Sequence, residues 1–228
     1  MLFMLSCFVL LVYFLGTEKM DERILKYYSR KDVQKEIVRL AKNREVAVKF
    51  GDKGYGKRPD VLQFDGDVRE FARQGATSFH VSEERWLNPL AIGNEKDKGK
   101  KNRIGWDLLL DVDSNFLTYS KICAKLIIDA LEFYDGNNFG VKFSGRSGIH
   151  IMVPFEAFPK FVNKKETSTL FPDGTKIVSL YLKNMIKDEL RKEIMKISNA
   201  EDIMKNTGKK FNDIVVDNLL NPFCVVDI

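Results

Sequence analysis

The chain of 228 residues is predicted to adopt an α+β (mixed α/β) fold with a central, mostly antiparallel sheet flanked by helices. Short apolar runs with strand character alternate with segments of helical spacing. Glycine-containing turns separate neighbouring strands, as in hairpins. Apolar residues make up 44% and charged residues 30% of the chain, which is the profile of a globular protein.

The first half is expected to combine short helices with a hairpin. Its expected elements are two short helices within 22–43, a strand over 45–50, a glycine turn over 51–56, a second strand over 58–64, a short helix over 67–73 and a strand over 77–81. A charged, glycine-containing loop over 93–101 follows and is expected to be solvated.

The second half is expected to carry the longest elements. They are an apolar strand over 104–112, a helix over 115–133 with Ser114 as its N-cap, strands over 139–143 and 149–154 joined by a tight turn, and a long helix over 176–197. Hairpins together with alternating strands and helices support the mixed fold class.

The composition limits the kinds of site that the chain can build. A formal charge of +5 suits a protein that meets phosphates, but many other proteins share it. The three cysteines lie far apart without a CxxC pair, so neither a disulfide framework nor zinc is expected, and a reducing, cytoplasmic compartment fits. With only two histidines, a site with several histidine ligands is excluded.

Both ends of the chain are unusual. Leu2 to Leu15 form an apolar run that is short for a membrane span and has no basic residue before it. We therefore interpret residues 1–19 as an apolar leader from a misassigned start, with Met20 as the true start and no membrane partner; a membrane anchor is the alternative. The chain stops at Ile228 within an apolar segment, so the catalytic domain expected over 20–228 is predicted to be truncated.

A pair of carboxylates follows the apolar strand. Asp111 and Asp113 stand at positions i and i+2, so their side chains point to the same face. Paired hard oxygen ligands suit Mg²⁺ or Mn²⁺. Taken alone, this motif favours the alternative that Asp113 begins the loop before Ser114 and Asp111 is exposed at a strand edge.

A glycine-rich turn lies one helix and one strand later. The segment Ser144-Gly145-Arg146-Ser147-Gly148 joins two apolar strands, and His150 enters the second of them. Glycines let backbone N–H groups converge on an anion, while arginine, serine and histidine add donors for phosphate oxygens. An ordinary hairpin turn is the alternative for this segment alone, but its combination with the carboxylate pair favours a nucleotide site.

The two segments together resemble the first two motifs of the archaeo-eukaryotic primase superfamily, most closely those of the DNA primase small (catalytic) subunit. The matching residues are Leu-Leu-Leu-Asp-Val-Asp at 108–113 and Ser-Gly-Arg-Ser-Gly-Ile-His at 144–150. Softer matches at Tyr27-Tyr28-Ser29, Asn43-Arg44-Glu45 and Gly56-Lys57-Arg58 extend the resemblance from about Met20 to the C-terminus.

The resemblance implies a set of site residues. Asp111 and Asp113 would be catalytic and bind a two-metal centre of Mg²⁺ or Mn²⁺. A third acid would join them, with Asp227 as the candidate and Asp217 as the alternative; either is equally readable as a plain strand-end carboxylate. The phosphates of the nucleotide would be held by Ser144, Gly145, Arg146, Ser147 and His150, and Glu45 and Arg58 would be possible cleft residues.

The resemblance also implies a function, namely DNA-templated synthesis of short RNA primers by two-metal nucleotidyl transfer during DNA replication. The expected partners are a single-stranded DNA template, nucleoside triphosphates and a primase large subunit. A repair-type or plasmid primase-polymerase is one alternative, and an inactive truncated homologue that only binds nucleic acid or a partner subunit is another. The chain departs from the family because it lacks a Cys/His zinc module and the basic segment beyond the third acid.

Overall fold

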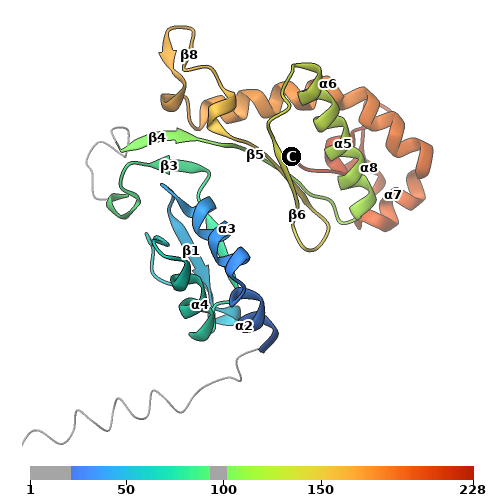
Figure 1. Cartoon of the computed structure of the whole chain (residues 1–228). Coiled ribbons are helices and arrows are strands. Elements are labelled where there is room, and N and C mark those ends of the chain that lie inside the picture. The colour runs from blue at the N-terminus through green and yellow to red at the C-terminus, as the bar shows by residue number, and fades with distance from the viewer. Residues whose placement is uncertain (1–21, 93–101) are drawn as a thin grey trace, which may run out of the picture. The chain divides into compact units, whose positions relative to one another are not determined.

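The computed structural model describes residues 22–92 and 102–228, and it has the predicted mixed α+β architecture with antiparallel sheets (Figure 1). The chain divides into two units, residues 1–102 and 103–228, and each is described by itself. The predicted fold class is confirmed. The interpretation of residues 1–19 lies outside the described residues, and a common catalytic domain over 20–228 stays a prediction.

The described part of the first unit packs three helices on a two-stranded antiparallel sheet. Its elements are α2 (Glu22–Tyr28), α3 (Lys31–Ala41), β1 (Val46–Lys49), the 3₁₀ turn Gly51–Lys53, α4 (Asp65–Arg73), β2 (Ser78–Val81), β3 (Glu84–Trp86) and the 3₁₀ turn Pro89–Ala91. β1 and β2 pair antiparallel with Val46 opposite Val81. Val46 and Val48 of β1 and Val68 of α4 are buried in one apolar cluster, which forms the core of this unit.

The strand expected over 58–64 is absent from the described residues. Only an isolated bridge forms there, between Val46 and Asp60, and the rest of the segment is irregular. Pro59 has no backbone N–H to donate to a neighbouring strand, which weakens pairing at this position. Leu62 of this segment is buried and packs in the core without belonging to a sheet.

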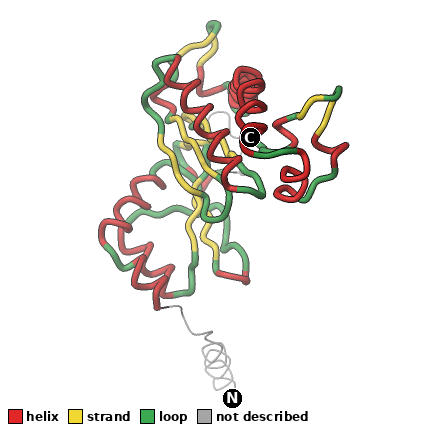
Figure 2. The backbone as a smooth tube through the Cα atoms, turned by 90° about the vertical axis from the view of Figure 1, so that its right-hand side faces the viewer, coloured by secondary structure: helices red, strands yellow, loops and turns green. Residues whose placement is uncertain are grey.

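The second unit is built around a three-stranded antiparallel sheet in the order β5–β7–β6. Figure 2 shows the strands of the structure in yellow and the helices in red. The strands of this unit are β4 (Arg103–Trp106), β5 (Leu108–Val112), β6 (Gly140–Phe143), β7 (Ile149–Val153), β8 (Phe161–Val162), β9 (Lys165–Glu166), β10 (Val215–Val216) and β11 (Leu219–Leu220). Its helices are α5 (Leu117–Phe133), α6 (Asp173–Ile197), α7 (Ala200–Thr207) and α8 (Phe211–Ile214), with short 3₁₀ turns at Phe155–Ala157, Thr167–Thr169 and Pro222–Cys224.

One face of this sheet is covered and the other stays open. Leu108, Leu110 and Val112 are buried, whereas the intervening Leu109 and Asp111 are exposed. This alternation is the period of a strand with one face on a core. The covered face therefore anchors β5 and leaves its polar side chains free for chemistry.

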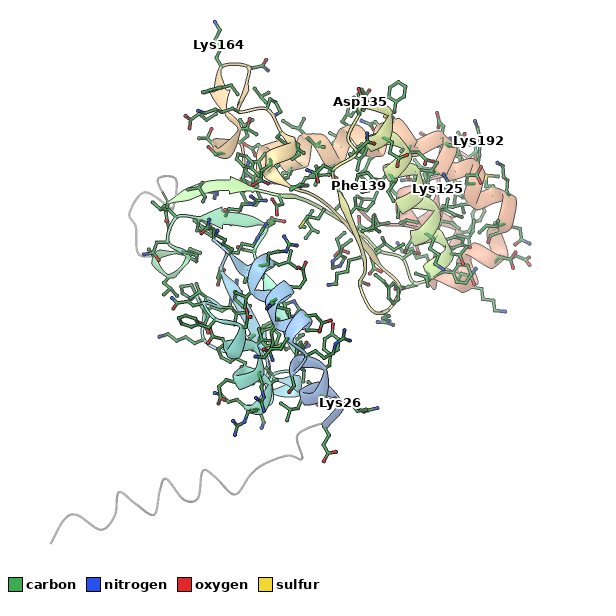
Figure 3. All side chains as sticks on the ribbon, viewed as in Figure 1. Lys26, Lys125, Asp135, Phe139, Lys164 and Lys192 are labelled. Carbon is green, nitrogen blue, oxygen red and sulfur yellow. The ribbon has the colours of Figure 1, made fainter. Side chains whose placement is uncertain are left out.

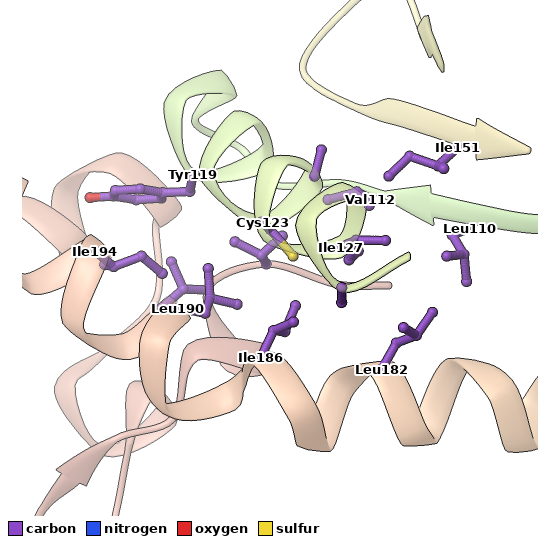
Figure 4. Packing of buried hydrophobic residues seen from close by; sticks show 14 of the residues in the cluster. Leu110, Val112, Tyr119, Cys123, Ile127, Ile151, Leu182, Ile186, Leu190 and Ile194 are labelled. Atoms are coloured by element: carbon purple, nitrogen blue, oxygen red, sulfur yellow. The ribbon is translucent and has the colours of Figure 1, made fainter. Parts of the chain in front are cut away.

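Helices α5 and α6 supply the layer that covers the sheet (Figure 4). Cys123 and Ile127 of α5 lie within the same core as Leu110 and Val112. The apolar stripe of α6, at intervals of four residues, completes this core with Leu182, Ile186, Leu190 and Ile194. Burial raises the pKa of the Cys123 thiol to about 12, although Lys183 lowers it somewhat.

Two sequence expectations in this unit are wrong in detail. The strand expected over 104–112 is divided between β4 and β5 at Asp107, which is buried and accepts a bond from the backbone N–H of Phe155 at 3.0 Å. Ser114 does not cap α5, because the helix begins at Leu117 and its cap position is Phe116; the Ser114 hydroxyl donates to the carbonyl of Val225 at 2.8 Å and accepts from the N–H of Phe116 at 3.4 Å. A buried polar side chain needs such a partner, and here it binds a distant segment.

Charged residues occupy the solvent side of the helices. Lys125 pairs with Asp129 one turn along α5, and Lys192 pairs with Glu189 on α6. Figure 3 shows Lys125 and Lys192 on the outer surface of this unit. Over residues 22–92 and 102–228, no helix combines the length and the apolar character needed to cross a membrane.

Candidate functional site

The carboxylates of Asp111 and Asp113 lie at the end of β5 on the open face of the sheet. Val112 between them is fully buried, which fixes the rotation of the strand and turns both acids the other way. The side chain of Asp111 is 65% exposed. The buried apolar residues of β5 thus set the direction of the polar ones.

Asp227 is brought beside this pair by the backbone. Asp113 and Asp227 form an antiparallel bridge, in which the N–H of Asp113 donates to the Asp227 carbonyl at 3.0 Å and the N–H of Asp227 donates to the Asp113 carbonyl at 2.8 Å. Directly opposite residues of an antiparallel pair present their side chains on the same face. Three carboxylates therefore share one face of the extended sheet.

Asp217, the alternative third acid, lies elsewhere. It has φ +51° and Asn218 has φ +62°, and together they form the two-residue turn between β10 and β11. Such a hairpin turn requires left-handed conformations, which aspartate and asparagine tolerate. The structure thus accounts for Asp217 as a turn residue.

The glycine-rich turn lies on the other side of Asp113. The N–H of Ser144 donates to the carbonyl of Gly148, and the Ser144 hydroxyl accepts from the N–H of Gly148, both at 3.0 Å. Ser147 donates to Oδ1 of Asp113 at 3.1 Å. The turn is therefore bonded directly to one of the three carboxylates.

The conformation of the turn depends on its glycines. Gly145 has φ +109°, a backbone conformation that favours glycine. A Cβ on Gly148 would lie 2.9 Å from the Ser144 hydroxyl and 3.2 Å from Oδ1 of Asp113. Gly148 is therefore needed for the close approach between the turn and Asp113.

The turn presents donors to solvent. Within the described part of the chain, the N–H groups of Gly145, Arg146 and Ser147 have no protein acceptor. The Arg146 side chain is exposed and makes no ion pair within the same described residues. A loop of unpaired N–H groups beside a guanidinium is suited to an anion such as a phosphate.

His150 lies on β7, the strand that follows the glycine-rich turn, and its side chain contacts one of the carboxylates. It lies opposite Asp111 in the β5–β7 register, and its Nε2 is 3.3 Å from Oδ1 of Asp111. Lys142 on β6 lies opposite His150 on the same face. Basic groups of β6 and β7 thus flank the acidic end of β5.

A pocket of about 340 Å³ opens at the carboxylates, and none of its lining residues comes from the turn. The residues that line it are Asp111, Asp113, Ser114, Asn115, Thr207, Lys209, Val225 and Asp227. Its volume is at the lower end of the range for ligand sites. The pocket therefore has room for one small ligand group beside the three acids.

No protein-family model matches the chain, and no curated protein matches it. Among solved structures, the chain is similar to the polymerase domain from Mycobacterium tuberculosis ligase D in complex with DNA, at 18% identity and a TM-score of 0.49. The match covers 72% of this chain and 62% of that chain.

Besides the three aspartates, the pocket is lined by five residues that sequence reasoning did not assign to the site: Ser114, Asn115, Thr207, Lys209 and Val225. Asn115 was expected only at the start of a helix, and Lys205 to Lys210 looks like a solvated basic stretch. Gly208 ends α7 with φ +71° and redirects the chain before Lys209; this glycine predicts the end of the helix but not the place of the lysine in the pocket. The redirected lysine donates from Nζ to the carbonyl of Cys224 at 2.6 Å.

Glu45 and Arg58 belong to the first unit. The guanidinium of Arg58 binds the carboxylate of Glu45 with two bonds, from Nε to Oε1 at 2.8 Å and from Nη2 to Oε2 at 2.9 Å. This bond raises the pKa of Arg58. Their place in a common cleft with Asp111 and Asp113 stays a prediction.

The donor chemistry at β5 fits a hard divalent cation. Carboxylate oxygens of Asp111, Asp113 and Asp227 are the ligands that Mg²⁺ and Mn²⁺ prefer. No preformed cluster of three or more metal-binding side chains occurs in the described residues. The side chain of Asp227 is 87% exposed, and its Oδ1 lies 3.8 Å from Nζ of Lys183 and accepts from the N–H of Ile228 at 2.8 Å, so a bound cation would compete with Lys183 for this carboxylate.

Proposed function

We propose that the second unit catalyses divalent-metal-dependent nucleotidyl transfer on a DNA template, as the DNA primase small subunit of the archaeo-eukaryotic superfamily does. The observation that carries this proposal is the bridge between Asp113 and Asp227, which adds a third carboxylate to the pair on β5. The turn with Arg146 lies beside the same carboxylates. The resemblance of the motifs at 108–113 and 144–150 supports the same reaction class.

The residues divide into two roles under this proposal. Asp111, Asp113 and Asp227 would hold Mg²⁺ or Mn²⁺, which supplies positive charge for a 3′-hydroxyl attack on an α-phosphate and for the leaving pyrophosphate. The N–H groups of the turn, Arg146 and His150 would bind the triphosphate. The bond from Ser147 to Asp113 couples the two groups by fixing one carboxylate.

Primer synthesis on single-stranded DNA tests the proposal. The purified chain is incubated with template, ribonucleoside triphosphates and Mg²⁺ or Mn²⁺, and labelled products are separated by length. We expect metal-dependent products with the wild type and a loss of about a hundredfold or more in Asp111→Asn and Asp113→Asn. Asp129→Asn, which makes the same charge change on the surface of α5, is the matched control.

Other outcomes have distinct signatures. Activity that survives the double substitution Asp111→Asn and Asp113→Asn contradicts the metal assignment. Extension of a supplied primer with deoxynucleotides, without synthesis from single nucleotides, indicates a primase-polymerase of the repair or plasmid type. DNA affinity without metal-dependent turnover indicates a binding protein. In the proposed role, the chain acts in replication with a primase large subunit.

A further inference from the structure

We propose that the pocket on the Asp227 side of the carboxylates binds the strand that carries the attacking 3′-hydroxyl, with Lys209 contacting the phosphate that precedes this hydroxyl. The inference rests on the proposed nucleotidyl transfer and assigns its second substrate. In the reaction, the 3′-oxygen forms a bond to the α-phosphorus, the bond to the bridging oxygen breaks, pyrophosphate leaves with that electron pair, and the hydroxyl proton passes to solvent.

The two flanks of Asp113 differ in chemistry. On one flank lies Gly148 of the glycine-rich turn, close enough that a Cβ there would be 3.2 Å from Oδ1 of Asp113. On the other flank lies Asp227, bonded to Asp113 through both backbone groups. The carboxylates thus stand between an anion-binding turn and the pocket.

An in-line displacement needs the attacking oxygen and the leaving pyrophosphate on opposite sides of the α-phosphorus. If the triphosphate occupies the turn with Arg146, the leaving pyrophosphate points toward that flank. The attacking oxygen must then approach from the opposite flank. The pocket beside Asp227 is the hollow on that side, and it includes both Asp111 and Asp113 in its wall.

The wall of the pocket is fixed by contacts between distant segments. The amide of Asn115 donates from Nδ2 to the carbonyl of Thr207 at 2.8 Å, which joins the start of α5 to the end of α7. The Ser114 hydroxyl binds the carbonyl of Val225 at 2.8 Å. Lys209 binds the carbonyl of Cys224 at 2.6 Å. Three chain segments therefore hold a preorganised site, which lowers the cost of binding.

Charge selects the part of the strand that this site can hold. Three of the lining residues are aspartates, which repel a phosphodiester, and Lys209 is the basic residue among the lining residues. An ammonium group has three donors, and the bond to Cys224 uses one of them. Lys209 can therefore bind a phosphate while the hydroxyl of the same nucleotide reaches the carboxylates.

The test compares Lys209→Ala with Lys205→Ala, a matched loss of one exposed lysine on α7 outside the pocket. The dissociation constant of a labelled primer–template is measured by fluorescence anisotropy, and KM for the incoming nucleotide is measured by extension. We expect Lys209→Ala to weaken primer binding about tenfold and to leave KM for the nucleotide within about twofold. Lys209→Arg should restore most of the affinity.

A second primer isolates the phosphate contact. Its last internucleotide linkage is a methylphosphonate, which removes one negative charge without removing the 3′-hydroxyl. We expect wild type and Lys209→Ala to bind this primer equally. An equal effect of Lys209→Ala on both primers, or a raised metal requirement with unchanged primer affinity, overturns the inference, because Lys209 would then act by positioning Asp227 through Cys224.

The experiments distinguish a failure of the pocket assignment from a failure of the proposed nucleotidyl transfer. If the wild type extends primers and Lys209→Ala binds and extends like Lys205→Ala, the pocket assignment is wrong and the proposed reaction stands. If the wild type has no turnover, the proposed reaction is wrong. The anisotropy measurement needs no turnover, so a Lys209-dependent and charge-dependent affinity for the primer end still supports the pocket assignment in that case.

Discussion

Asp113 and Asp227 are joined by two backbone hydrogen bonds, of 3.0 and 2.8 Å, so the last residues of the chain extend the edge of β5. These bonds use no side-chain atoms. The position of the Asp227 carboxylate is therefore set by main-chain pairing, and its chemistry can be changed without breaking the bridge.

Asp227→Asn is expected to reduce metal-dependent primer synthesis about a hundredfold while the free energy of unfolding changes little, because the amide keeps the shape but loses the charge that a divalent ion needs. Asp217→Asn is the matched control, since asparagine tolerates the left-handed turn at this position. Primer assays over a range of Mg²⁺ or Mn²⁺ concentrations measure both variants. Equal activity in the two variants would exclude Asp227 from the site.

Gly148→Ala is expected to disrupt the turn. The added methyl group would lie 2.9 Å from the Ser144 hydroxyl and 3.2 Å from Oδ1 of Asp113. We expect a loss of about 1–3 kcal/mol in the free energy of unfolding, measured with urea, and reduced nucleotide binding. Gly140→Ala on β6 is the control, because no atom lies within 4 Å of the position of its Cβ. Similar losses of stability in both variants would show that the close contacts at Gly148 do not cause the effect.

Local patterns predict the parts of this fold that depend on local forces. The apolar period of α6 and the buried alternation of β5 are visible in sequence because one face of each element meets the core. The strand predicted over 58–64 does not form, since Pro59 cannot donate to a partner strand. Leu62 of this segment is buried all the same, so an apolar residue can pack in the core without strand pairing.

In the candidate site too, some residues are predictable from local sequence and others depend on long-range contacts. The i and i+2 spacing predicts the shared face of Asp111 and Asp113, which follows from strand geometry alone. Lys209 could not be predicted, because its place in the pocket depends on the turn at Gly208 and on a carbonyl of Cys224 far along the chain. A surface lysine and a pocket lysine have the same local sequence signal, so only the long-range contacts separate them.

The Cys123 thiol provides a test of the core between α5 and β5. Burial raises its pKa from 9.0 to about 12, so the folded state holds this proton more tightly than the unfolded state does. The stabilisation is complete below pH 9 and is lost as the pH rises from 9 toward 12. We expect the stability advantage of the wild type over Cys123→Ala to be about 1 kcal/mol smaller at pH 10 than at pH 8.

Urea unfolding at both pH values measures this difference. Ile127→Val is the control, because it removes volume from the same core without removing a titratable group, and its loss of stability should be equal at pH 8 and pH 10. A Cys123→Ala difference that does not change with pH would mean that the thiol is accessible to water.

Arg146 in the glycine-rich turn separates nucleotide binding from strand binding. It is exposed and lies beside unpaired N–H groups in the described part of the second unit, an arrangement that favours a triphosphate. Arg146→Ala is expected to raise KM for the incoming nucleotide about tenfold, and Arg146→Lys less, because lysine keeps the charge but loses the planar fork. The affinity for a primer–template should change within about twofold, in contrast to Lys209→Ala.

Lys164→Ala is the charge-matched control, since Lys164 lies in the turn between β8 and β9 at the surface of the same unit (Figure 3). Extension kinetics at several nucleotide concentrations give KM, and anisotropy gives the affinity for the primer–template. If Arg146→Ala weakened the primer–template and left KM unchanged, the turn would hold the strand and the pocket would hold the triphosphate. The two flanks of Asp113 would then exchange roles, while the in-line relation between them would remain.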